Sequence, residues 1–171
     1  MPGARTLDAL TLFTAGGANL AYFQFAPAPQ PTHAVLFTAS YLFAGYACAG
    51  DLDLDSSEFR RWGPLRVLWL PYQKIVPHRS WVSHGLILGG VIRALYLALV
   101  VTIICWLSIY VYSLFHPTID PTTVIRSRWF ALMDIVKARP YETIAIFSGF
   151  VLAGTTHSLA DYTSTWFKRR F

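Results

Sequence analysis

The longest apolar stretch of the chain, residues 84–115, reads HGLILGGVIRALYLALVVTIICWLSIYVYSLF. About 20 apolar residues cross the hydrocarbon core of a bilayer as one helix, so this stretch is long enough to span a membrane. Its first turns contain His84 and Arg93, which are costly beside lipid, so we expect the helix to begin at the membrane interface or inside a bundle. The stretch indicates an all-α integral membrane protein.

Three further apolar stretches complete the predicted fold. Residues 9–26 end at a turn with three prolines, which cannot continue a helix, and residues 33–50 follow that turn. Residues 141–161 form the last stretch, near the C-terminus. We therefore predict a single membrane domain, residues 1–171, built as a four-helix transmembrane bundle with a loop between its third and fourth helices.

Composition agrees with the membrane class. Apolar residues make up 54% of the chain and charged residues 13%, whereas a soluble domain carries about 25% charged residues. The net charge of +5 lies beside apolar stretches and not in a dense basic stripe, so the expected partner is the lipid bilayer and no nucleic acid. Cys48 and Cys105 lie inside apolar stretches, which favours neither a disulfide framework nor a thiolate metal site.

Basic residues predict the orientation. With four spans, both termini and the loop of residues 51–83 share one side, which carries nine Lys and Arg residues against four on the other side. The positive-inside rule then predicts a multi-pass protein of the bacterial cytoplasmic (inner) membrane with cytoplasmic termini. Within that loop, residues 65–72 (LRVLWLPY) suit an amphipathic segment on the membrane surface.

Potential metal ligands from three apolar stretches are expected to meet at this cytoplasmic face. His157 and Asp161 in HSLAD are four residues apart, so they project from the same face of a helix. PHRSWVSH supplies two histidines, and DLDLD supplies carboxylates but lacks the glycine and distal glutamate of a calcium loop. The predicted ligands are Asp51, Asp53, His78, His84, His157 and Asp161.

The carboxylates also have a structural alternative, in which they pair with Arg60, Arg61 or Arg79. For Asp55 and Glu58 we expect this pairing in preference to metal binding.

The mixed nitrogen and oxygen donor set suits a divalent transition metal, Zn²⁺ or Mn²⁺, better than Mg²⁺ or Ca²⁺. Such a site could activate water for attack on a phosphoester or lipid-type substrate, with Asp53 as a catalytic base. Arg79 could bind an anionic substrate group, or equally hold Asp51 or Asp53 in place. The predicted function is therefore a membrane metal-dependent hydrolase.

Residues 50–85, GDLDLDSSEFRRWGPLRVLWLPYQKIVPHRSWVSHG, followed by an Arg-containing apolar run and HSLAD, resemble a bacterial family of predicted metal-binding membrane proteins. That family is distantly similar to inner-membrane metal-dependent hydrolases, and the resemblance implies a metal site at the residues just named. One departure is Leu7, in ARTLD, where the family usually reads GRTHD. One ligand is then lost or replaced, for example by Asp8.

Two other functions stay open. The Leu7 departure also fits a catalytically inactive relative that serves as an accessory subunit of a larger membrane complex and contacts pigment. A third idea is that His84 or His157 ligates a haem or chlorophyll ring. His33 and His116 are expected near the opposite membrane face, outside the site.

Overall fold

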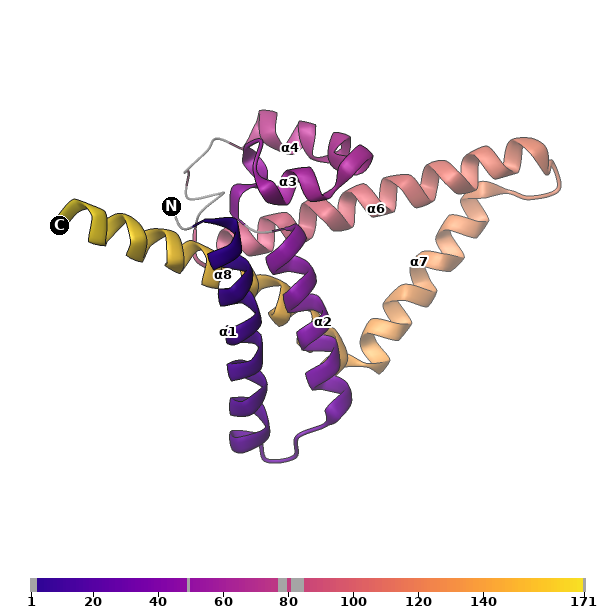
Figure 1. Ribbon diagram of the computed structural model, residues 1–171. Helices are drawn as coiled ribbons and strands as arrows, with labels where there is room; N and C mark the ends of the chain where they lie inside the picture. The colour runs from indigo at the N-terminus through magenta and orange to yellow at the C-terminus, as the bar shows by residue number, and fades with distance from the viewer. Residues whose placement is uncertain (1–2, 49, 77–79, 81–84, 171) are drawn as a thin grey trace.

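The computed structural model of the protein describes residues 3–48, 50–76, 80 and 85–170. Every regular element in these ranges is helical, as the sequence predicts (Figure 1). The elements are, in chain order, α1 (Ala4–Phe25), α2 (Pro31–Ala47), the 3-10 helix η1 (Gly50–Asp53), α3 (Ser57–Arg61), the 3-10 helix η2 (Gly63–Trp69), α4 (Leu70–Ile75), α6 (Leu88–Phe115), α7 (Pro121–Ala138) and α8 (Pro140–Arg170).

α1 and α2 form an antiparallel hairpin around the proline-containing turn (Figure 1). Pro31 occupies the first turn of α2, where a missing N–H costs nothing because it has no intrahelical acceptor. Tyr22 Oη accepts a hydrogen bond of 2.8 Å from the Gln30 N–H, which closes the turn. The first two predicted helices are therefore present, each shifted toward the N-terminus by a few residues.

α8 crosses this hairpin and makes its most extensive contact with α2. Gly149 permits the close approach, because a Cβ there would lie 2.5 Å from the Phe37 carbonyl oxygen. Tyr41 Oη lies 2.8 Å from Thr14 Oγ1 of α1 and 2.6 Å from Thr156 Oγ1 of α8. One hydroxyl group thus joins three helices.

α6 packs against α8 through its first turns. Its buried residues are Gly89, Gly90 and Arg93, and a Cβ on Gly90 would lie 2.9 Å from the Val151 carbonyl oxygen. Farther along, α6 extends away from α1 and α2 (Figure 1). The apolar side chains of this part of α6 are exposed. The described residues contain two helices that could span a membrane, which does not support the predicted four-helix transmembrane bundle. α6 is apolar on all sides, so its sequence contains no single face that would direct it into a bundle.

The predicted loop between the third and fourth apolar stretches is wrong, because it contains α7. Asp120 starts this helix as its N-cap and accepts hydrogen bonds from the backbone N–H groups of Thr122 and Thr123, at 3.2 and 3.1 Å. No residue of α7 is buried. Because basic residues interrupt its apolar residues, α7 contains no uniformly apolar stretch that would predict a helix here.

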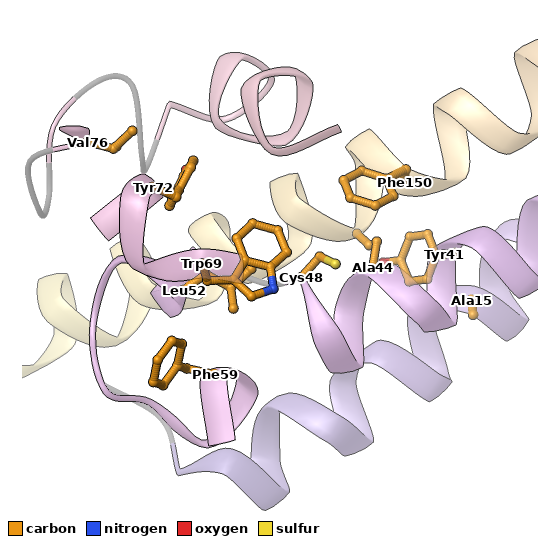
Figure 2. Close-up of a cluster of buried hydrophobic side chains, with 11 residues drawn as sticks. Ala15, Tyr41, Ala44, Cys48, Leu52, Phe59, Trp69, Tyr72, Val76 and Phe150 are labelled. Atoms are coloured by element: carbon orange, nitrogen blue, oxygen red, sulfur yellow. The ribbon is translucent and has the colours of Figure 1, made fainter. Parts of the chain in front are cut away.

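The segment from η1 to α4 covers the ends of α2 and α6 that lie near each other (Figure 1). Trp62 Nε1 donates to the Ala47 carbonyl oxygen at 2.6 Å, and Trp69 is 1% exposed while Leu65 is 58% exposed. The predicted amphipathic segment is thus helical, with one apolar side turned inward. Figure 2 shows the resulting core, whose members are Ala15, Tyr41, Ala44, Cys48, Leu52, Phe59, Trp69, Tyr72, Val76, Phe150 and Ala153.

Two helices are long and apolar enough to cross a membrane, Leu88–Phe115 and Pro140–Phe167. The apolar part of α6 contains no buried residue, whereas almost half of the corresponding part of α8 is buried against the other helices. Among the described residues, neither α1 nor α2 meets the same length and composition test.

Candidate metal centre

His157 and Asp161 lie one turn apart on α8 and face the protein interior. His157 is 5% exposed and Asp161 is 7% exposed, and His157 Nε2 lies 3.5 Å from Asp161 Oδ2. The helical spacing of four residues produces this pairing, because such residues stack on one helix face. The structure therefore brings together two of the six predicted ligands.

Asp53 is a third predicted ligand with a buried carboxylate. It ends η1, is 7% exposed, and belongs to a short helix that contacts α8. Gln73 Nε2 donates hydrogen bonds of 3.0 and 3.1 Å to the carbonyl oxygens of Leu52 and Leu54, on either side of Asp53. These bonds fix the backbone that presents the carboxylate.

The remaining predicted site residues lie outside the described part of the structure. These are His78, Arg79 and His84, together with the side chain of Asp51. Within the described residues, no group of three His, Cys, Asp or Glu side chains is close enough to hold a metal ion. The six-ligand site therefore stays a prediction. Of the six residues, the structure shows His157 and Asp161 next to each other.

Arg93 is a buried charge that the sequence analysis did not assign to the site. It is 0% exposed, and a Cβ on Gly154 of α8 would lie 2.6 Å from its Nη2 atom. Tyr72 is close to both Arg93 and Asp53: burial raises the pKa of the Tyr72 hydroxyl, the Arg93 charge lowers it and the Asp53 charge raises it. The sequence does contain a signal for Arg93 as a site residue: it is the one charged residue in the longest apolar stretch, and charges inside such stretches are commonly functional.

The other acidic residues of this segment have structural roles. Arg60 donates hydrogen bonds of 3.0 and 2.9 Å to the two carboxylate oxygens of Asp55, and this pairing lowers the pKa of Asp55. Glu58 is 3% exposed and accepts a hydrogen bond of 2.8 Å from Ser57 Oγ. The expected arginine pair is thus confirmed for Asp55, whereas Glu58 is a buried carboxylate that the sequence did not predict.

Leu7, where the resemblance predicts a histidine, is 7% exposed on the inner side of α1. Asp8, the suggested replacement ligand, instead accepts a hydrogen bond of 2.6 Å from Arg61 Nη2. The same hydrogen bond raises the pKa of Arg61. Asp8 therefore ties α1 to α3.

His33 lies far from the candidate site, as the sequence predicts. Its ring is 6.0 Å from the ring of Tyr141, and both line a cavity of about 330 Å³ between α1, α2 and α8. Tyr141 precedes His157 by 16 residues on α8, which corresponds to about 24 Å along the helix axis.

Residues 2–171 match the model of a family described as uncharacterized metal-binding protein (DUF2227). The chain belongs to this family. The resemblance to metal-binding proteins that the sequence predicted is therefore confirmed, and the family description specifies neither the ion nor a reaction. No curated protein and no solved structure matches the chain.

Proposed function

We propose that this protein is embedded in the bacterial inner membrane and catalyses metal-dependent hydrolysis at the cytoplasmic face, acting on a phosphoester or lipid-type substrate. The observation that carries the proposal is the buried His157–Asp161 pair on α8 in a chain that belongs to a metal-binding family. Two span-length apolar helices support the membrane location.

The separation of the pair supports binding of one ion by both side chains. Nitrogen and oxygen ligands bind tetrahedral zinc at about 2.0–2.2 Å, which places two ligand atoms about 3.4 Å from each other. His157 Nε2 and Asp161 Oδ2 are 3.5 Å apart, whereas a good charge-assisted hydrogen bond is about 2.7–2.9 Å. The pair thus has the spacing expected for two ligands of one ion, and its donor types fit zinc or manganese.

Asp51, Asp53, His78 and His84 are the proposed further ligands, drawn from the segment before α6. The bound ion would supply Lewis-acid chemistry. Asp53 is buried and held by a fixed backbone, so it is suited to accept a proton from the attacking water. Arg79 would bind the anionic group of the substrate through its planar guanidinium.

Metal analysis of the purified full-length chain tests the proposal. We expect one or more zinc or manganese ions per chain, lost or weakened at least tenfold in His157→Ala and in Asp161→Asn. His116→Ala is the matched control, because His116 follows α6, stacks on Tyr112 and should leave the metal content unchanged. A metal-free wild-type protein, or metal content unaffected by both variants, would contradict the proposed site.

A hydrolase assay separates catalysis from binding. We expect the metal-loaded protein to hydrolyse phosphoester or lipid-phosphate substrates. Asp53→Asn, compared with the wild type at equal metal content per chain, should lower the rate by about 10²–10⁴-fold, the usual contribution of a general base. Wild-type protein that binds metal but hydrolyses neither phosphoesters nor carboxylic esters would refute the hydrolase and favour an accessory subunit.

The accessory-subunit alternative rests on Leu7, which is buried at the position where the resemblance predicts a histidine ligand. Under the hydrolase proposal, Leu7→His should raise the metal content or affinity, because the new imidazole would point inward. Leu12→His is the control, since Leu12 is 54% exposed on another side of α1. No change in metal binding with Leu7→His would show that Leu7 lies outside the ligand set.

A further inference from the structure

α7 has two chemically different sides. Ile125, Trp129, Leu132 and Val136 recur at helical spacing and form an apolar side. At helical spacing, Asp134 lies opposite this stripe, and Arg126 and Lys137 lie at its flank. Trp129 and Leu132 are 49% and 48% exposed, and no residue of α7 is buried by the described protein. The apolar side is therefore available to an external partner.

The charge of α7 is predominantly basic. Arg126, Arg128 and Lys137 outnumber Asp134, the one acidic residue between Pro121 and Ala138. An amphipathic helix with basic residues on its polar side and Trp or Leu on its apolar side is typical of helices that lie in a membrane interface. Basic residues near the headgroups also attract anionic lipids.

The place of α7 in the chain fits such a position. It connects the end of α6 at Phe115 to the start of α8 at Pro140, which are the two span-length helices (Figure 1). If both cross the membrane, these two ends lie at the same face. Eighteen residues of α7 extend about 27 Å, enough to connect the two ends along the membrane surface.

We infer that α7 lies in the headgroup layer of the leaflet opposite the candidate metal centre and binds anionic lipid headgroups through Arg126 and Lys137. Arg93 precedes Phe115 by 22 residues and Asp161 follows Pro140 by 21 residues, so each is about 30 Å away along its helix. That distance is about one hydrocarbon thickness. The inference rests on the membrane location proposed above and does not depend on metal binding or hydrolysis.

A second copy of the chain is the competing occupant of the apolar side. A second α7 carries the same excess of basic over acidic residues, so it offers no charge complementary to Arg126 and Lys137. An anionic lipid surface neutralises the same charges, so the observations favour the membrane.

Site-directed probes in full-length protein test the inference. The chain is reconstituted in vesicles of phosphatidylcholine alone or mixed with phosphatidylglycerol. A fluorescent thiol label is placed at one introduced cysteine at a time in a Cys105→Ser background, in which the remaining native Cys48 is buried. Leu132→Cys reports on the apolar side of α7 and Ser127→Cys on the polar side. Native Cys105, exposed on α6, is the control for membrane insertion itself.

We expect lipid-attached quenchers to reach the labels at Cys105 and Leu132→Cys, and aqueous iodide to reach the label at Ser127→Cys. Arg126→Glu with Lys137→Glu should reduce lipid quenching at Leu132→Cys in the anionic vesicles and should leave Cys105 unaffected. If lipid-attached quenchers reach the label at Cys105 but only aqueous iodide reaches the label at Leu132→Cys, the inferred position of α7 is wrong and the membrane location stands. An aqueous label at Cys105 would overturn the membrane location. Disulfide formation between two Leu132→Cys chains, without lipid quenching, would identify a second copy as the occupant.

Discussion

At the level of single residues, the interior of this protein contains several ionisable side chains. Asp53, Arg93, His157 and Asp161 are all less than 10% exposed. Burying a charge is costly unless opposite charges and hydrogen bonds compensate for the lost water. In a chain of which Asp, Glu, Lys and Arg make up only 13%, Asp53, Arg93 and Asp161 lie with His157 near the junction of η1, α6 and α8. This concentration supports the proposed site, because structural packing alone would be served by apolar residues.

Glycine at position 90 sets how closely α6 approaches this junction. We expect Gly90→Ala to lower the free energy of unfolding by about 1–3 kcal/mol, the usual cost of overpacking. The added Cβ would lie 2.9 Å from the oxygen and 3.0 Å from the Cα of Val151, and backbone atoms cannot rotate away. Thermal unfolding in detergent measures the effect.

Gly16→Ala is the matched control, because a Cβ at Gly16 of α1 meets no atom within 4 Å. Alanine has the higher helix propensity, so this variant should be neutral or more stable by up to about 1 kcal/mol. Equal unfolding temperatures for Gly90→Ala and the wild type would show that the α6–α8 contact is looser than the structure has it.

At the level of elements, the ends of the helices follow local rules that the sequence contains. The proline turn between α1 and α2 and the N-cap at Asp120 are examples. The hydroxyl of Thr123 is the largest cause that lowers the pKa of Asp120 to about 2, followed by Thr122. A carboxylate with a lowered pKa stabilises the folded state above its ordinary value of 3.8 and loses this effect as the pH falls toward 2.

We therefore expect the first turn of α7 to fray between pH 4 and pH 2 in the wild type, measured as faster hydrogen exchange of residues 121–125 relative to the centre of the helix. Asp120→Asn keeps a capping oxygen but cannot ionise. In this variant, hydrogen exchange of residues 121–125 should change between pH 4 and pH 2 only as the exchange rate of an unprotected amide does. Asp134→Asn, in the middle of α7, is the control that should behave as the wild type. Identical pH dependence in Asp120→Asn would assign the fraying to another group.

At the level of the whole molecule, α6 and α8 are joined through α7, and this connection predicts the topology. If α6 and α8 each cross the membrane once, α7 and the end of α8 lie on opposite sides. We expect a membrane-impermeant thiol reagent to label Thr165→Cys from the cytoplasmic side and Ser127→Cys from the other side, each in a Cys105→Ser background. Oriented vesicles of both polarities provide the measurement, and labelling of both positions from one side would contradict the two-span arrangement.

Local patterns in the sequence determined the helical class, the apolar length of α6, the family and the pairing of His157 with Asp161. Each of these depends on residues close together in the chain, where helix periodicity fixes which side chains share a face. The fold of α7 was missed because amphipathic helices carry no uniformly apolar run.

Only the tertiary structure decided that most of α6 packs against no other described helix, that Arg93 is buried against Gly154, and that Asp8 accepts a hydrogen bond from Arg61. These outcomes depend on which surfaces fit together between segments far apart in sequence. A glycine on one helix makes room for an arginine on another, and no local pattern of either helix records the match.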